Sequence, residues 1–240
     1  MGLNPYRDPS YLDRYGRYVI GRSYDDAYVA GARLVIEKAA RFIYDELKKD
    51  GRQHACGDAT MVLARILERE GVWSVPMTGA ARVEFPEGSG LSTRRFARIV
   101  DDPRATTMGH AWLIAPPFKV VDLTIDLQGW RAAEARYFSG PVLAEETDTS
   151  TYTIDDLVDT VAQRLFVRAH RRQPTIADVD EGGLPERVRA YGCFAVFAGK
   201  AKVTYISCAP SAPDVPLEEM GNLILRGKGP KALYEEFLRL

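Results

Sequence analysis

Apolar residues recur at helical spacing in two segments near the start of the chain. From residue 25 to residue 49 they fall every three or four positions, and the run ends at KKDG, whose glycine is a typical helix stop. A second stripe begins at Cys56 and ends near Gly71, and its apolar members are Ala59, Val62, Leu63, Ile66 and Leu67. The pattern predicts two amphipathic helices, with Cys56 at the start of the second.

Three segments have the composition of strands. Residues 72–85 are rich in β-branched and aromatic side chains. Residues 110–126, HAWLIAPPFKVVDLTID, predict a hairpin because two apolar runs flank Ala-Pro-Pro. A second hairpin is expected over residues 191–208, turning at Gly199 and Lys200.

The remaining pattern is weaker. Helices are expected over residues 153–170, with Leu157, Val161, Leu165 and Ala169 facing inward, and over the closing KALYEEFLRL. Residues 86–109 predict a long loop, a feature that is often functional. Its basic stretch STRRFARIV is open to two interpretations, a solvated face or a lid that grips an acidic substrate.

These segments suggest three parts of the chain. Residues 1–24 are rich in Tyr, Arg, Asp and Pro without periodicity and predict an irregular N-terminal arm. Residues 25–130 contain the two helices and the first hairpin and form the predicted core. Residues 131–240 are expected to be a C-terminal α/β extension packed on the same domain.

The first hairpin places a histidine near an aspartate. If residues 115–117 form its connection, His110 lies opposite Asp122, and a two-residue connection places the pair on a near diagonal instead. Both residues then share one face with Trp112. The simplest packing sets that face on the helix of Cys56, which brings Cys56 to His110.

These three residues suggest nucleophilic catalysis. A thiol attacks a carbonyl as a thiolate, and both a helix N-terminus and a nearby imidazolium favour that charge. Taken singly, Cys56 is typical of a small buried hydrophobe, His110 of a core histidine, and Asp122 of a turn cap. Taken jointly, they predict a Cys-His-Asp triad in which Asp122 orients His110.

Two motifs also carry a resemblance to a known family. ACGDATMVLARILEREGV resembles the nucleophile helix of the transglutaminase-like superfamily, and GHAWLIAPPFKVVDLT is similar to its histidine strand followed by its aspartate strand. The resemblance covers residues 25–130 and implies an α+β, papain-like core with the nucleophile helix packed on an antiparallel sheet. It implies Cys56 as nucleophile, His110 as general base and acid, and Asp122 as the orienting carboxylate.

The oxyanion donors are less clear from the sequence. Papain-like peptidases use a glutamine several residues before the cysteine, and Gln53 is the candidate here although it lies only three residues before Cys56. The backbone amide of Cys56 is a second donor. Asp58, in the first helical turn, stabilises the helix but opposes a neighbouring thiolate.

The expected activity is attack by Cys56 on an amide, peptide or isopeptide bond of a peptide or protein substrate, with a thioester intermediate. Water as acceptor makes the protein a peptidase or amidase, and an amine makes it an acyltransferase. Two alternatives stay open: a non-catalytic transglutaminase-like peptide-binding module, and acyl transfer like that of arylamine N-acetyltransferases.

Composition and motifs exclude several classes of partner and cofactor. Thirty-two basic and 33 acidic residues give a net charge of -1, so no overall field favours nucleic acid or a membrane surface. The longest charge-free run, residues 105–118, contains two prolines, and no secretory signal is recognisable, so a cytoplasmic protein is expected. No glycine-rich phosphate loop is present, so no cofactor is implied.

The other cysteines and histidines are expected to have no role in chemistry. Cys193 and Cys208 fall in apolar strand-like segments and are expected in the core as free thiols. His54, two residues before Cys56, lacks the further closely spaced ligands of a metal site, so no metal is expected. His170 is interpreted as a solvated cation at a helix end.

Overall fold

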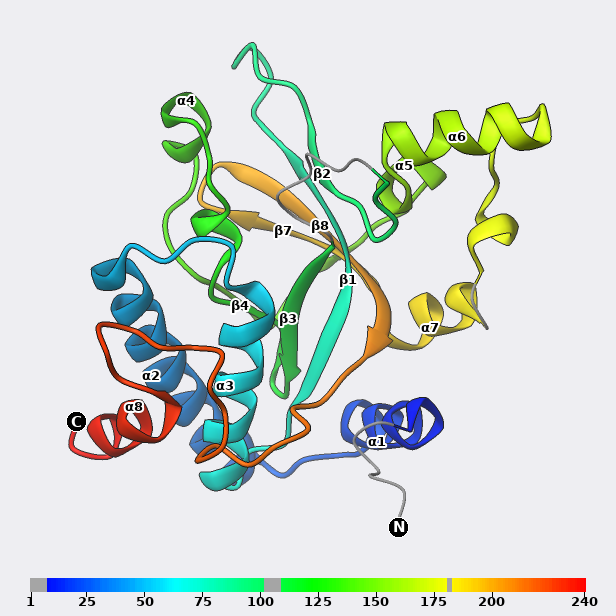
Figure 1. Cartoon of the computed structure of the whole chain (residues 1–240). Helices are drawn as coiled ribbons and strands as arrows, with labels where there is room; N and C mark the ends of the chain where they lie inside the picture. The colour runs from blue at the N-terminus through cyan, green and yellow to red at the C-terminus, as the bar shows by residue number, and fades with distance from the viewer. Residues whose placement is uncertain (1–7, 102–108, 181–182) are drawn as a thin grey trace.

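A computed structural model describes residues 8–101, 109–180 and 183–240 (Figure 1). Its helices are α1 (Pro9–Gly21), α2 (Asp26–Asp50), α3 (Cys56–Arg69), α4 (Ala132–Ala135), α5 (Ile154–Leu157), α6 (Thr160–His170), α7 (Leu184–Tyr191) and α8 (Pro230–Phe237), with 3-10 turns η2 (Ile125–Leu127) and η3 (Ile176–Val179). Its strands are β1 (Val75–Glu84), β2 (Arg94–Phe96), β3 (His110–Ala115), β4 (Phe118–Asp122), β5 (Val142–Ala144), β6 (Asp148–Thr149), β7 (Cys193–Ala198) and β8 (Ala201–Pro210).

The strands form one antiparallel sheet that curls back on itself. Its order is β5-β4-β3-β1-β8-β7-β6, and β2 pairs with the end of β1. The two edge strands β5 and β6 belong to one short segment of chain, residues 142–149, so the sheet must bend round for both to pair. Because helices accompany an antiparallel sheet, the α+β expectation is confirmed at this level. Strands from residues 25–130 and from residues 131–240 lie in the same sheet.

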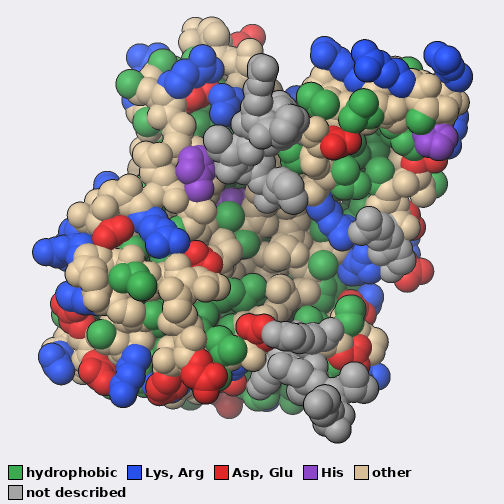
Figure 2. All heavy atoms as spheres, in the orientation of Figure 1, with side chains coloured by type: hydrophobic (Ala, Val, Ile, Leu, Met, Phe, Trp, Pro, Cys, Tyr) green, Lys and Arg blue, Asp and Glu red, His purple; other side chains and the backbone are tan. Residues whose placement is uncertain are grey.

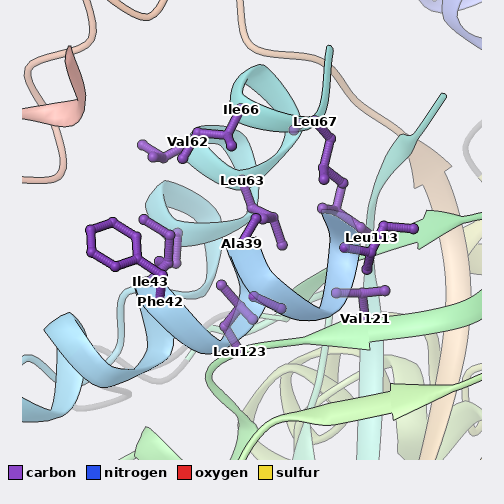
Figure 3. Close-up of a cluster of buried hydrophobic side chains, with 14 of the residues drawn as sticks. Ala39, Phe42, Ile43, Val62, Leu63, Ile66, Leu67, Leu113, Val121 and Leu123 are labelled. Carbon is purple, nitrogen blue, oxygen red and sulfur yellow. The ribbon is translucent and has the colours of Figure 1, made fainter. Parts of the chain in front are cut away.

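Helices α2 and α3 cover one face of this sheet. Figure 3 shows the apolar side chains that fill the space between them. Ala39 and Ile43 of α2 and Leu63 and Ile66 of α3 are fully buried, and they belong to one cluster with Leu113 of β3. The amphipathic stripes seen in the sequence are therefore the faces that bury both helices against each other and the sheet.

The opposite face of the sheet lines a second cluster. Trp112, Val120, Val203 and Tyr205 are buried there together with Val19 of α1. A third, smaller cluster contains Cys193 and Cys208 as predicted. The sheet therefore has apolar cores on both faces, and both cysteines are buried.

Several predicted elements are confirmed. The structure contains both long helices, the strand within residues 72–85, both hairpins and the C-terminal helix. Gly199 and Lys200 form the turn between β7 and β8, as expected.

Two predictions of secondary structure are wrong. Residues 9–21 form α1 instead of an irregular arm: Asp8 caps the helix, and only three residues, Leu12, Gly16 and Val19, are buried, which is too sparse an apolar pattern to recognise. The expected helix over residues 153–170 is broken at Val158, which is extended and bridges to Ile99. Of the residues expected to face inward, Leu157 of α5 is buried, whereas no residue of α6 is: Val161 is half-buried, Leu165 is 42% exposed and Ala169 is exposed.

The long connection before β3 is also partly ordered. Residues 94–96, placed in a loop by the sequence, form β2 and pair with β1 through Ala81 and Phe96. Phe96 is buried, whereas Arg94 and Arg95 are exposed. Residues 102–108 of the expected lid lie outside the described part of the chain.

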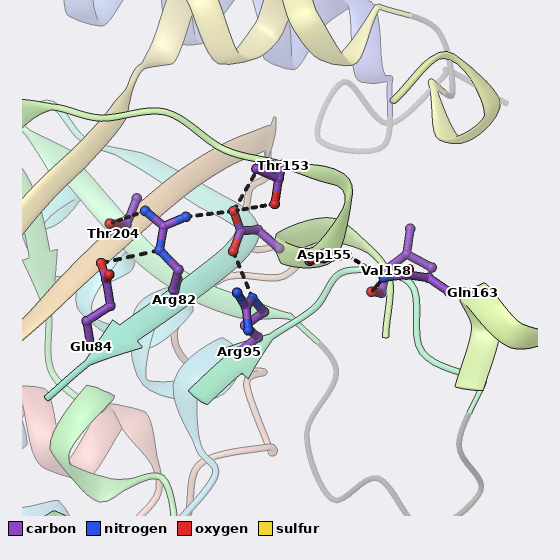
Figure 4. A network of polar contacts seen from close by, with 9 residues as sticks. Arg82, Glu84, Arg95, Thr153, Asp155, Val158, Gln163 and Thr204 are labelled. Carbon is purple, nitrogen blue, oxygen red and sulfur yellow. Dashed lines mark hydrogen bonds and ion pairs between the residues drawn. The ribbon is translucent and has the colours of Figure 1, made fainter. Parts of the chain in front are cut away.

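A buried carboxylate ties this region together (Figure 4). Asp156 of α5 is fully buried and pairs with Arg82 of β1 at 2.8 Å and with Arg95 of β2 at 3.1 Å. It also accepts hydrogen bonds from the backbone amide and hydroxyl of Thr153, which closes the first turn of α5. The expected lid segment is thus tied to β1 and α5 by paired charges.

Asp156→Ala is expected to destabilise the protein by about 3 to 5 kcal/mol, because it leaves Arg82 without its buried partner and removes the α5 cap. Urea unfolding at pH 7 measures the change in the free energy of unfolding. The control is Glu84→Ala, which removes a 41% exposed carboxylate from the same arginine and is expected to cost less than about 1 kcal/mol. Equal losses in the two variants would contradict the assignment.

Candidate active site

Cys56 is the first residue of α3, as the sequence predicts. The residue before it, Ala55, offers no side-chain oxygen to the helix, so the first backbone N–H groups have no side-chain cap. Cys56 is partly exposed, in contrast to Cys193 and Cys208. The thiol therefore lies at the positive end of a helix dipole with access from solvent.

His110 is the first residue of β3 and pairs with Gly79 of β1. Its side chain is fully buried, and its Nε2 lies 2.7 Å from Oδ2 of Asp122. Its Nδ1 is also buried. Because Asp122 occupies Nε2, Nδ1 is the ring nitrogen left for the thiol.

The register of the hairpin differs from the direct opposition predicted for His110 and Asp122. The connection is two residues long, since Ala115 pairs with Phe118, and Leu113 pairs with Val121. The register shifts between these two pairs, and continuing it past Leu113 sets Asp122 opposite Trp112. The shorter connection and this shift together place His110 and Asp122 on a diagonal. The imidazole of His110 is long enough to span this diagonal, and its Nε2 forms the hydrogen bond to Asp122.

The prediction that the face carrying His110 packs on the helix of Cys56 is also wrong. The structure places Trp112, Ile114 and Val120 in the second cluster, while Leu113 and Val121 of the other face pack on α2 and α3. Leu113, Val121 and Leu123 fill the contact with the helices, so α3 lies against the odd-numbered face. Cys56 still reaches His110, because its helix begins beside the start of β3, where the Ala111 amide donates to the thiol.

Asp122 has a hydrogen-bond donor for each oxygen. Oδ2 accepts from His110 and from the hydroxyl of Tyr205, which is 2.7 Å away. Oδ1 accepts from the backbone amide of Thr124 at 2.8 Å, from its hydroxyl, and from the amide of Ile125. A carboxylate that is 1% exposed is thereby kept charged and fixed in orientation.

The charges of the three residues depend on one another. Burial opposes protonation of His110, but the charge and hydrogen bond of Asp122, helped by Cys56, raise its pKa to about 10. Burial also disfavours ionised Asp122, yet His110 and the donors around it lower its pKa. Burial opposes ionisation of Cys56, but the hydrogen bond and charge of His110 lower its pKa below the ordinary value. The arrangement favours a thiolate beside an imidazolium.

Aromatic rings enclose the imidazole. Phe96 of β2 lies 5.8 Å from it and Trp112 lies 6.2 Å from it, both measured between ring centroids. Tyr205 of β8 lies at 6.1 Å and supplies the hydroxyl to Asp122. Sequence reasoning missed Tyr205 and Phe96, because nothing in a single strand shows which strand it will pair beside.

Gln53, the predicted oxyanion donor, lies in the exposed segment before α3. It forms no hydrogen bond with any described residue, and its Oε1 lies close to Gly129, in the turn that follows η2. His54 packs on the same glycine, because a methyl group there would be 2.7 Å from its Nε2. Its backbone has φ +56°, and its amide donates to the carbonyl of Leu127. The segments before Cys56 and after Asp122 therefore lie side by side.

Asp58 is less of an obstacle to a thiolate than the sequence suggests. Its carboxylate pairs with Arg52 at 3.0 Å, and Arg52 also donates to the carbonyl of Asn222. Burial raises the pKa of Asp58, which Arg52 opposes. The ion pair offsets the negative charge in the first turn of α3.

The remaining candidates lie away from Cys56. His170 is exposed at the end of α6, as expected, and stacks on Phe166 at 4.2 Å. Within residues 8–101, 109–180 and 183–240, no three His, Cys, Asp or Glu side chains come together as metal ligands. No helix of these residues is long and apolar enough to cross a bilayer.

No family model, curated protein or solved structure matches this chain. The arrangement around Cys56 is therefore interpreted from its own geometry.

The ion pair predicts a pH dependence of stability. Because the pKa of His110 is about 10 when folded and about 6.5 when unfolded, its contribution is complete below pH 6.5 and is lost as pH rises toward 10. Between Cys56→Ala and Cys56→Ala/His110→Gln, the difference in unfolding free energy is expected to shrink with pH by up to about 1.4 kcal/mol per unit. Urea titrations from pH 6 to pH 10 measure it, and parallel curves would contradict the pair.

Tyr205→Phe is expected to cost about 2 kcal/mol of stability, because it removes a donor to a buried carboxylate and leaves the ring in place. Thermal and urea unfolding at pH 7 give the value. Tyr234→Phe is the control: it removes the same kind of bond, to Glu70 at the partly buried surface, and is expected to cost less than about 1 kcal/mol. A Tyr205→Phe variant as stable as its parent argues against this bond.

Proposed function

We propose that this protein is a cysteine-nucleophile enzyme that cleaves or transfers an amide, peptide or isopeptide bond through a thioester on Cys56. One observation carries the proposal: a partly exposed thiol at an uncapped helix N-terminus lies beside a buried imidazole whose other nitrogen binds a fully hydrogen-bonded carboxylate. A cysteine nucleophile needs an ionisable thiol next to such a base, whereas a purely structural histidine does not.

The reaction follows from the order of proton transfers. His110 holds the proton released by the thiol, and Sγ of Cys56 attacks the carbonyl carbon to form a tetrahedral oxyanion. The Cys56 amide, with Gln53 as a further candidate, donates to that oxyanion. The C–N bond breaks as His110 returns the proton to the leaving amine, which leaves the acyl group on sulfur. Water or a second amine then attacks the thioester.

Asp122 has a positioning role in this scheme. Its hydrogen bond to Nε2 fixes the tautomer of His110 and turns Nδ1 to the thiol side. It also stabilises the imidazolium that exists while the thiolate attacks. The pKa of the thiol is lowered through His110, since the charge of Asp122 by itself raises the pKa of Cys56.

The fold supports the same class of protein. The order Cys56, His110, Asp122, with a helix that begins at the thiol and two neighbouring antiparallel strands, agrees with the proposed transglutaminase-like, papain-like core. We favour hydrolysis of a peptide or isopeptide bond in a protein substrate. The exposed segment that contains Gln53 and His54 directly precedes Cys56 in the chain and is a surface that such a substrate could contact.

The test is the pH dependence of iodoacetamide labelling at Cys56, followed by mass spectrometry. We expect labelling to persist below the ordinary thiol pKa of about 8.5, and to slow at pH 7 by at least about tenfold in His110→Ala. Loss of the imidazole leaves burial as the dominant influence on the thiol, so its pKa rises.

Cys193 is the internal control, since it is buried and its pKa is raised to about 11, so labelling there is expected to be slow in both proteins. The second readout is amine release from a peptide mixture, which Cys56→Ala is expected to abolish. Slow labelling that is indifferent to His110 would falsify the nucleophile and favour a non-catalytic peptide-binding module.

A further inference from the structure

Helix α6 is an unusual part of this fold, because it stands out from the body of the protein as an arm (Figure 1). None of its residues is buried. It is attached through α5, whose Asp156 and Leu157 are buried, and through Asp159, which caps it. An exposed helix of this length needs no apolar side chains, yet α6 has several.

The charge of this arm is opposite in sign to that of the whole protein. Residues 164–172, RLFVRAHRR, contain four arginines, one histidine and no acidic residue, while the chain has a net charge of -1. Arg172 pairs with Asp178. Arg164, Arg168 and Arg171 are exposed, and their side chains make no hydrogen bond or ion pair with the described residues.

Two of these arginines form a stripe along the helix, and the third caps its end. Arg164 and Arg168 lie one turn apart on the same side of α6, and Arg171 is its C-cap. Figure 2 shows basic side chains along the outer edge of the arm. Nothing among the residues that the structure describes neutralises this stripe, so its charge is available to a partner.

An apolar stripe runs beside the arginines. Val161 and Leu165 lie one turn apart, and Leu165 is 42% exposed. In Figure 2 apolar side chains of the arm lie below its basic edge. The arm thus combines an apolar strip with a row of cations.

We propose that α6 binds an acidic, amphipathic segment of another protein. Leucine or valine side chains of that segment would cover Leu165, and carboxylates one turn apart would pair with Arg164 and Arg168. Guanidinium groups bind carboxylates in a planar, two-bond geometry, and arginine with large apolar side chains is the composition enriched in protein interfaces.

The geometry disfavours the two other anionic surfaces. A bilayer is flat and needs a broad apolar strip with basic groups on both flanks, whereas Val161 and Leu165 form a narrow strip with arginines on one flank. Nucleic acid contacts phosphates through cations and gives no partner to an exposed aliphatic strip. An acidic, amphipathic protein segment can pair its carboxylates with the arginines and cover the apolar strip at the same time.

The test uses a fluorescein-labelled peptide that repeats Glu-Leu-Ala-Ala and a matched peptide with Lys in place of Glu. Anisotropy titrations at low salt are expected to show binding of the acidic peptide only. Arg164→Glu/Arg168→Glu is expected to weaken binding at least about tenfold, and Leu165→Ser several-fold. The control, Arg14→Glu/Arg41→Glu, alters exposed arginines on α1 and α2 and is expected to leave binding unchanged.

The remaining outcomes are equally informative. Cys56→Ala is expected to bind the acidic peptide as the parent does, so failure of the enzymatic proposal leaves this one standing. Absence of binding, or equal binding by Arg164→Glu/Arg168→Glu and the control, overturns it. Tighter binding to a DNA oligonucleotide or to phosphatidylserine vesicles than to the acidic peptide also overturns it. Circular dichroism checks that each variant is folded.

Discussion

The arrangement around Cys56 depends on keeping the charge of Asp122 inside the protein. Moving a carboxylate out of water costs several kcal/mol, and the cost is offset only when its oxygens are fully hydrogen-bonded and a counter-charge is close. The structure meets both conditions with groups from three places: His110 on β3, Tyr205 on β8 and the backbone after β4. Loss of any of these strands from the sheet would leave the carboxylate partly unsatisfied.

The sheet can supply these groups only because backbones approach closely at one point. A methyl group at Gly79 of β1 would lie 2.0 Å from the carbonyl oxygen of Ile206 and 2.8 Å from the ring of Trp112. The pairing of β1 with β8 shifts its register at this glycine. Gly79 is also the partner of His110, so the absence of its side chain lets β8 and β3 both pack against β1 near the candidate site.

The features that could be predicted from the sequence are those whose interacting residues are close together along the chain. Helices α2 and α3 were predictable because a regular apolar stripe records their burial locally, and the hairpin because Ala-Pro-Pro interrupts two apolar runs. The diagonal pairing of His110 with Asp122 depended on a connection one residue shorter and on a register shift between Leu113 and Ala115 that no sequence pattern marks. Tyr205 was beyond prediction, since its partner is 83 positions away and only the fold of the whole sheet brings them together.

The pKa of Cys56 is set by opposing effects of burial, Asp122, His110 and a backbone amide. Burial and the charge of Asp122 both raise the pKa of the thiol, whereas the hydrogen bond and charge of His110 and the amide of Ala111 lower it. Asp122 favours the thiolate only indirectly, by keeping His110 protonated, and this effect exceeds its repulsion because His110 lies between the two anions. A histidine held rigidly on β3 therefore lowers the pKa of the thiol, whereas a carboxylate closer to the thiol would raise it. The enclosure of its ring by Phe96, Trp112 and Tyr205 provides that rigidity.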